Sequence, residues 1–365
     1  MYCDLTNCFL VHIRPAQHNR PLRWHVGSDL KGIEKVSTLV HSDTLFSAIC
    51  HAWSQIFGKK DLDDCLCQFK GDNVPFRLSS LLPLGSGGNQ YFLPKPCLEM
   101  PQSATPDLFL RFQKAVQNVV FVSLETLQEW LELRTISPRP DRRCEVFYRK
   151  MVQDFQSYQR LFCVGTEMGI RMDSTGMSSP NVFYRGFSGV QEQEYGYYLV
   201  LQCLNAKYLG QLKLALDEVG RAGLGGERSL GFGKFTVDKV MPLPQEWKNF
   251  FRGSATVAGY LLLSLYSPSD SERSQIDLNH ARYTLVPRKG WFHSPTGYAF
   301  KRKRCQFLGE GSFVPMMSGN EPSGSLVDVS PEIWAKKCDE LQDVWHAIYR
   351  YGIALGIPVY EKEAT

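Results

Sequence analysis

The chain has 365 residues, of which 43% are hydrophobic and 21% are charged, and its formal net charge is +4. This length can bury two cores of ordinary domain size, and the composition argues against wholesale disorder. So small a net charge does not mark a nucleic-acid-binding protein, and any such surface must come from local clusters. The eleven cysteines include no Cys-x-x-Cys pair, which argues against a zinc ribbon or a redox pair. Without a signal peptide or a long apolar run, the sequence predicts a cytoplasmic protein with no membrane span.

The first predicted elements are a strand over residues 5–13, stopped at Arg14, and a long helix that follows a polar, basic loop. Ser42 or Asp43 is the expected N-cap, because either side chain can accept a hydrogen bond from the first turn. Gly58 closes the helix. The apolar face that should pack on a sheet consists of Leu45, Phe46, Ile49, Trp53, Ile56 and Phe57.

Residues 59–180 form a predicted insertion with weak periodicity. Residues 103–135 are expected to be helical. The stretch 137–150 then combines arginines with two aromatic side chains, which is typical of a single-strand RNA contact. A solvated charged loop is the alternative interpretation of the same composition.

Two strands, at 183–187 and 195–204, precede a helix over 205–220, a glycine loop at 223–233 and a strand over 234–240. With the first strand and helix, these elements give a βαββαβ order. The predicted fold class is therefore α+β, with two ferredoxin-like (RRM-type) domains. The first, 1–242, carries the long insertion, and the second, 243–365, is degenerate, with strands near 256–269, 281–292 and 301–314. Its closing segment, 344–359, is expected to be extended, with a helix for the first half as the alternative.

The glycine loop reads GLGGERSLGFG and is followed by Lys234. Its spacing fits neither a P-loop nor a dinucleotide fingerprint, because it follows a helix and opens a strand. Bare backbone N–H groups together with Arg228, Ser229 and Lys234 would suit a phosphate. A turn that only lets helix and strand pack closely is the alternative.

This loop resembles the signature loop of the RAMP superfamily of CRISPR RNA-binding proteins. Residues 32–53, the C-terminal RKGWF and GEGSFV segments and the closing segment 344–359 are similar to one branch, the crRNA 5′-tag-binding subunits of type III-A (Csm) effector complexes in the Cas-five group. The basic run 301–304, between the RKGWF and GEGSFV segments, is equally typical of a solvated strand edge.

The resemblance implies a noncatalytic subunit that holds the repeat-derived 5′ tag of the guide RNA. Such a subunit caps the backbone filament of RAMP subunits next to the large Palm-domain subunit, and its thumb, expected within residues 95–175, kinks the guide. No cofactor, metal or catalytic residue is expected. The residues expected to contact RNA are Lys35, His41, Ser42, Arg142, Arg143, Phe147, Gly223, Gly225, Gly226, Arg228, Ser229, Gly231, Gly233 and Lys234.

Two other functions fit the same sequence. A metal-independent RAMP endoribonuclease could use His18, His25 or His41 as a general base if the fold brought one of them to a 2′-hydroxyl. A protein-only scaffold would use the glycine loop for packing alone.

Overall fold

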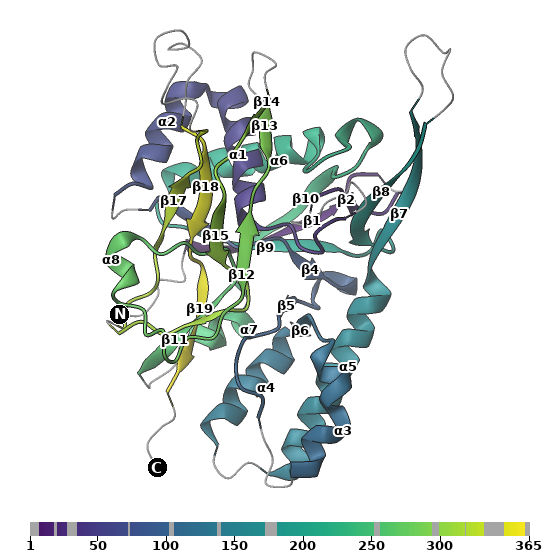
Figure 1. The fold of residues 1–365 in the computed structure, drawn as a ribbon, viewed down its shortest axis with the longest axis vertical. Coiled ribbons are helices and arrows are strands. Elements are labelled where there is room, and N and C mark those ends of the chain that lie inside the picture. The colour runs from purple at the N-terminus through teal and green to yellow at the C-terminus, as the bar shows by residue number, and fades with distance from the viewer. Residues whose placement is uncertain are drawn as a thin grey trace.

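In the computed structural model, the placed residues are 7–17, 20–27, 35–71, 74–101, 106–136, 140–171, 181–251, 256–293, 299–317, 319–331 and 347–361. Helices and strands are interspersed along the described chain (Figure 1). The described residues thus form a mixed α/β fold whose sheets are antiparallel, in agreement with the α+β prediction.

The main sheet has the strand order β10 (Phe235–Pro242), β1 (Cys8–Pro15), β9 (Gly196–Cys203) and β3 (Phe76–Leu78), and β4 (Leu82–Leu84) also pairs with β9. Every residue of β9 is buried, which places it in the centre of the fold. The prediction is confirmed for β1, β9 and β10. Residues 183–187 are also a strand, as predicted, within β8 (Asn181–Val190). Their expected place in the main sheet is wrong, because β8 lies in another sheet and the short β3 and β4 pair with β9 instead.

Helices α1 (Ser42–Phe57) and α6 (Lys207–Ala222) pack against each other over this sheet, and α2 (Lys59–Gln68) follows α1. The predicted apolar face of α1 is buried at Leu45, Phe46, Ile49 and Trp53. The predicted cap is wrong: His41 is the N-cap and makes no side-chain cap hydrogen bond. Ser42 and Asp43 instead bond to distant parts of the chain.

The insertion is a helical layer at the bottom of Figure 1. It holds η2 (Ser86–Gly88), β5 (Phe92–Pro94), α3 (Pro106–Gln117), β6 (Phe121–Ser123), α4 (Leu124–Thr135) and α5 (Asp141–Leu161). The single helical stretch predicted for 103–135 is therefore two helices separated by β6, and residues 103–105 lie outside the described part. From residue 141 onward, the predicted charged loop is the start of α5.

A hairpin of β7 (Phe162–Arg171) and β8 (Asn181–Val190) projects from the body of the protein (Figure 1). At its base β8 also pairs with β2 (Arg23–Trp24), where Trp24 is buried. The hairpin is thus anchored beside the chain segment that follows β1.

The second part begins with α7 (Gln245–Lys248) and η4 (Asn249–Phe251), and its other described helix is the short α8 (Asp270–Arg273). Its strands form several small sheets. One sheet has the strand order β16 (Phe313–Val314), β11 (Val257–Leu262) and β19 (Gly356–Tyr360). Two further sheets are the pairs β12 (Leu285–Arg288) with β15 (Cys305–Leu308) and β13 (Trp291–His293) with β14 (Ala299–Lys301). The last is the pair β17 (Gly324–Asp328) with β18 (Tyr349–Ile353).

The two parts share one hydrophobic core. The ring of Phe46 on α1 lies 4.7 Å from that of Tyr351 on β18, measured between centroids. The Tyr351 hydroxyl also accepts a hydrogen bond from the backbone N–H of Leu78 at 2.8 Å. The second part is therefore built onto the first through α1 and β3.

Candidate nucleic-acid interface

The glycine loop lies between α6 and β10 and packs against residues 23–26. Gly233 has φ +71°, and a Cβ there would lie 2.0 Å from the Leu224 carbonyl oxygen. Gly225 has φ +93°, and a Cβ there would lie 2.7 Å from the His25 carbonyl oxygen. Because both positions combine a left-handed backbone with close backbone contact, only glycine fits them.

Most of the glycine amides are already used within the protein. The N–H groups of Gly226 and Gly233 donate to the carbonyls of His25 and Arg23, each at 2.7 Å. The Gly223 N–H donates to the Val219 carbonyl at the end of α6 at 2.9 Å, and the Gly231 N–H donates to the Arg228 carbonyl within the loop at 3.0 Å. The prediction that these four amides face a phosphate is therefore wrong, and the loop's role is to hold neighbouring side chains in place.

A cleft of about 360 Å³ opens beside the loop. The Arg20 guanidinium lies 3.8 Å from the Cβ position of Gly231, so the loop forms one wall and the segment after β1 forms the other. Three cationic side chains and one carboxylate line it, which favours an anionic ligand. The lining residues are Ala16, Gln17, Arg20, Pro21, Leu22, Arg23, Glu167, Leu230, Gly231, Phe232 and Lys234.

Two arginines near the cleft are held by both an acid and a ring. Arg23 forms an ion pair with Glu167 on β7, and its guanidinium lies 4.3 Å from the centroid of Phe187 on β8. Arg185 pairs with Glu227 of the glycine loop at 2.8 Å and lies 5.3 Å from the Phe183 ring. These contacts fix the guanidinium planes and join the hairpin to the loop.

The predicted side-chain donors of the loop stand at the surface. Arg228 and Ser229 are exposed on the single turn η3 (Arg228–Leu230), and Leu230 of the same turn lines the cleft with the half-buried Lys234. Lys35 is exposed and precedes Val36, which bridges to Gly27 close to the segment that the loop contacts. Of the predicted donors, only Lys234 lines the cleft, whereas Arg228 and Ser229 are exposed on the same loop and Lys35 lies on the adjoining segment.

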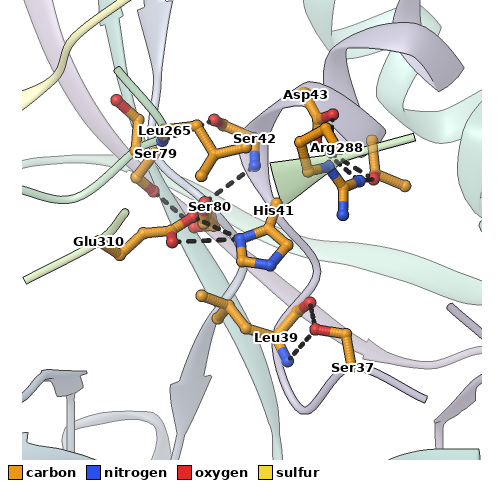
Figure 2. Close-up of polar contacts among 12 residues, drawn as sticks. Ser37, Leu39, His41, Ser42, Asp43, Ser79, Ser80, Leu265, Arg288 and Glu310 are labelled. Atoms are coloured by element: carbon orange, nitrogen blue, oxygen red, sulfur yellow. Dashed lines mark hydrogen bonds and ion pairs between the residues drawn. The ribbon is translucent and has the colours of Figure 1, made fainter. Parts of the chain in front are cut away.

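His41 and Ser42 face the second part of the protein instead (Figure 2). His41 is 12% exposed, and its Nδ1 lies 2.9 Å from Glu310 Oε1. Ser42 is fully buried; its N–H donates to Ser80 Oγ at 2.8 Å, and its Oγ accepts from the Leu265 N–H at 3.1 Å. The predicted RNA contacts of Ser42 and His41 are wrong for this structure, because both polar groups are engaged between the two parts.

Asp43 is the centre of a buried ionic cluster. Its carboxylate accepts from Arg288 Nε and Nη2 at 2.9 and 3.0 Å (Figure 2). It also pairs with Arg350. Burial alone would raise the pKa of Asp43, but the two arginines outweigh burial and hold its pKa at about 2. Burial would also raise the pKa of Glu310, but the neighbouring His41 outweighs burial and holds this pKa below its usual value.

The predicted thumb contacts lie on α5, away from the cleft. Arg142 is exposed in the first turn, and Arg143 pairs with Glu132 on α4 at 3.3 Å. Because α5 has 21 residues, it separates them from β7 by roughly 30 Å. Phe147 is 0% exposed, with its ring 5.5 Å from that of Trp130, so the expectation that it contacts RNA is wrong.

The histidines of the nuclease hypothesis do not form a common site among the described residues. His25 Nδ1 lies 2.7 Å from the Gly186 carbonyl oxygen, whereas His41 is paired with Glu310. His18 lies outside the described residues. Over the described part of the chain, no group of three or more His, Cys, Asp or Glu side chains is arranged to hold a metal ion.

Arg20, Arg23 and Arg185 were missed as site residues. The basic loop after the first strand was a visible signal for Arg20 and Arg23. For Arg185 the only local signal was its place between two phenylalanines, Phe183 and Phe187, which in a strand share its face.

Comparisons with known proteins agree on one family. Residues 256–359 match the model of the CRISPR Csm4 C-terminal domain. The "CRISPR system Cms protein Csm4" of Methanocaldococcus jannaschii is 21% identical over 399 positions, covering 97% of this chain and 98% of that protein.

Solved structures are similar over nearly the whole chain. A chain from the Csm3–Csm4 subcomplex of a type III-A CRISPR-Cas interference complex matches with a TM-score of 0.59 and 18% identity, covering 97% of this chain and 99% of that one. A chain from a Csm1–Csm4 cassette in complex with AMPPNP matches with a TM-score of 0.53 and 18% identity, covering 98% and 99%. These matches establish the fold. None of the helices in the described ranges has the length and apolar character needed to cross a bilayer.

Proposed function

We propose that this chain, a member of the Csm4 family of type III-A CRISPR subunits, binds the repeat-derived 5′ tag of the guide RNA without cutting it. The observation that carries the proposal is the cationic cleft beside the glycine loop, where Arg20, Arg23 and Lys234 converge. A single strand offers one phosphate per nucleotide, and a cleft with an excess of fixed cations neutralises such a backbone.

The side chains, rather than the loop amides, would hold the phosphates. Arg20 and Lys234 line the cleft, and Arg228 stands exposed on the same loop. The glycines keep the loop flat against residues 23–26, so that these donors stay in one orientation. Because the tag is the same in every guide from one array, contacts to its bases are also compatible with this site.

The β7–β8 hairpin is the best candidate for the thumb. It projects from the body directly above the cleft wall, since Glu167 of β7 lines the cleft. The first strand of the hairpin lies within the range expected for the thumb, whereas α3, α4 and α5 form a packed helical layer. We place the kink of the guide at this hairpin.

The strand order β10-β1-β9-β3, with α1 and α6 on the sheet, favours a ferredoxin-like first domain, followed by a degenerate second one. By analogy with the subunits of the similar complexes, the chain would contact a backbone RAMP subunit and the large Palm-domain subunit, in the cytoplasm.

The noncatalytic part of the proposal rests on the histidines. His12 is 2% exposed, and burial together with Arg14 lowers its pKa to about 4. His41 is held by Glu310 between the two parts. Neither ring is placed to take a proton from a ribose in the cleft.

The test is to purify the chain with its neighbouring subunits and sequence the 5′ ends of the RNA that accompanies them. Arg20→Glu/Lys234→Glu should remove the uniform repeat-derived 5′ end, while Arg111→Glu/Lys114→Glu on the exposed surface of α3 serves as the matched control. Retention of the same RNA by both variants would reject the cleft as the tag site.

Incubation of the purified chain with precursor RNA in EDTA tests the absence of catalysis. Intact RNA is expected. Cleavage that disappears in His25→Ala or His41→Ala would instead assign the chain to the endoribonucleases.

A further inference from the structure

A second positively charged surface lies in the C-terminal part. Between residues 278 and 309 the chain has no aspartate or glutamate. The same stretch contains seven cations, which are Arg282, Arg288, Lys289, Lys301, Arg302, Lys303 and Arg304. This local charge of +7 exceeds the net charge of +4 of the whole chain, so the rest of the protein carries a net charge of −3.

Several of these side chains are exposed around the β13–β14 hairpin, and we call Lys289, Trp291, Lys301, Lys303 and Arg304 the basic patch. Trp291 is 63% exposed, an unusual position for so large an apolar ring. It is directly opposite Lys301 in the antiparallel register, so both side chains lie on the same face of the hairpin. A flat ring flanked by cations suits a base with its phosphates.

Hydrogen bonds to the backbone fix the segments that carry the basic patch. The N–H of Arg302 donates to the Gly290 carbonyl at 3.0 Å, and the N–H of Lys303 donates to the Val329 carbonyl at 3.1 Å. Arg350 Nη2 donates to the Lys289 carbonyl at 2.9 Å while its other nitrogen pairs with Asp43. The backbone that carries the exposed cations is therefore tied to the buried ionic cluster.

The charge balance beneath the patch stays positive. Arg288, Arg302 and Arg350 surround Asp43, which is buried and already paired with two of them. Burial and the neighbouring Arg350 lower the pKa of Arg302 to about 10, as expected for a cation short of counter-charge. The exposed Asp328 ends the strand next to Val329 and contributes one negative charge nearby, which the surrounding cations outnumber.

We propose that the basic patch binds a second stretch of single-stranded nucleic acid, with one base stacked on Trp291 and the adjacent phosphates at Lys301 and Lys303. This contact is separate from the cleft. Figure 1 shows β13–β14 well apart from β2 and the β7–β8 hairpin. The proposal does not rest on the tag function, because the two surfaces share no residue.

The experiment uses the full chain carrying Arg20→Glu/Lys234→Glu, which removes binding at the cleft. Fluorescein-labelled oligouridine and oligothymidine are titrated by anisotropy over a range of KCl concentrations. The variants are Lys301→Gln/Lys303→Gln, Trp291→Ala and Trp291→Phe, with Arg111→Gln/Lys114→Gln as the control of equal charge change. All four affect exposed side chains, and thermal unfolding checks that the fold is kept.

We expect the lysine variant to weaken binding at least tenfold and to reduce the slope of log K against log salt by about 0.7 for each phosphate that the variant no longer neutralises. Trp291→Ala should weaken the affinity at least about fivefold, and Trp291→Phe should retain most of the affinity because it can still stack.

Tighter binding of oligouridine would identify an RNA strand as the ligand, and tighter binding of oligothymidine would identify a DNA strand. Affinity equal to that of the control would overturn the proposal. So would variants that bind both probes normally but fail to purify with the neighbouring subunits, since the patch would then dock protein.

Discussion

Asp43, in the first turn of α1, accepts two hydrogen bonds from Arg288 at 2.9 and 3.0 Å, although 245 residues separate them in sequence. The carboxylate is fully buried and also pairs with Arg350. Two arginines on strands β12 and β18 of the second part therefore neutralise the carboxylate in the first turn of α1. This helix start is therefore buried between the two parts of the protein.

Asp43→Asn should lower the free energy of unfolding by about 3–5 kcal/mol, because it leaves two buried guanidiniums without their anion. Urea unfolding followed by circular dichroism measures the change. Asp238→Asn is the matched control: its carboxylate is 39% exposed and 3.8 Å from Arg14, so a loss below about 1 kcal/mol is expected. Equal losses in the two variants would contradict a special role for the buried cluster.

The same carboxylate makes stability depend on pH. Its pKa is about 2 in the folded protein against 3.8 as the reference value, so the folded state binds this proton less tightly. The stabilising contribution is therefore fully present above about pH 4 and is lost as the pH falls toward 2. The lowered pKa of Glu310 acts in the same direction. Urea unfolding at a series of pH values should show the wild-type advantage over Asp43→Asn shrinking in this range; a constant difference would be the contrary result.

Gly233→Ala should open the glycine loop, because the new methyl group would lie 2.0 Å from the Leu224 carbonyl oxygen at φ +71°. Backbone strain alone costs about 1–3 kcal/mol, and the contact adds to it. Gly210→Ala is the control, since nothing lies within 4 Å of its Cβ position on α6, and a gain of up to about 1 kcal/mol is expected. A higher free energy of unfolding in both alanine variants than in the wild type would contradict this prediction, because the loop would then have room for the methyl group.

Phe147→Ala should cost about 3–5 kcal/mol, as expected for a fully buried ring, and Arg142→Ala about 0.5 kcal/mol or less. Arg142→Ala should also leave the affinity for tag RNA unchanged, because α5 holds this residue far from the cleft. Anisotropy with labelled tag RNA measures it. A large loss of affinity in this variant would return α5 to the RNA interface.

The elements with strong local signals were predicted from the sequence. The apolar face of α1, the alternation in β10 and the glycines between α6 and β10 were all recognised, because each signal lies within a few neighbouring residues. The three-residue strands β3 and β4 were missed, since their pairing with β9 is fixed by packing and not by their own pattern.

The site was predicted less well, for a physical reason. Charge and aromaticity at 137–150 suggested an RNA contact, but the same residues form a helix whose ring at Phe147 faces the core. The partners of Ser42, His41 and Asp43 come from positions 265, 310, 288 and 350, and no local pattern indicates contacts at such separations. The cleft likewise depends on three separate segments that meet only in the fold.

The link between Leu78 and the Tyr351 hydroxyl also bears on how the protein is made. A nascent chain that still has residues 350 and 351 inside the ribosome has a finished β3 whose Leu78 N–H lacks this acceptor, and an α1 whose Asp43 lacks Arg350. The first part therefore reaches its final stability only after residues 350 and 351 have left the ribosome and joined it. A truncated product that lacks residues 350 and 351 would leave the ring of Phe46 without its contact to Tyr351 and the buried carboxylate of Asp43 without Arg350.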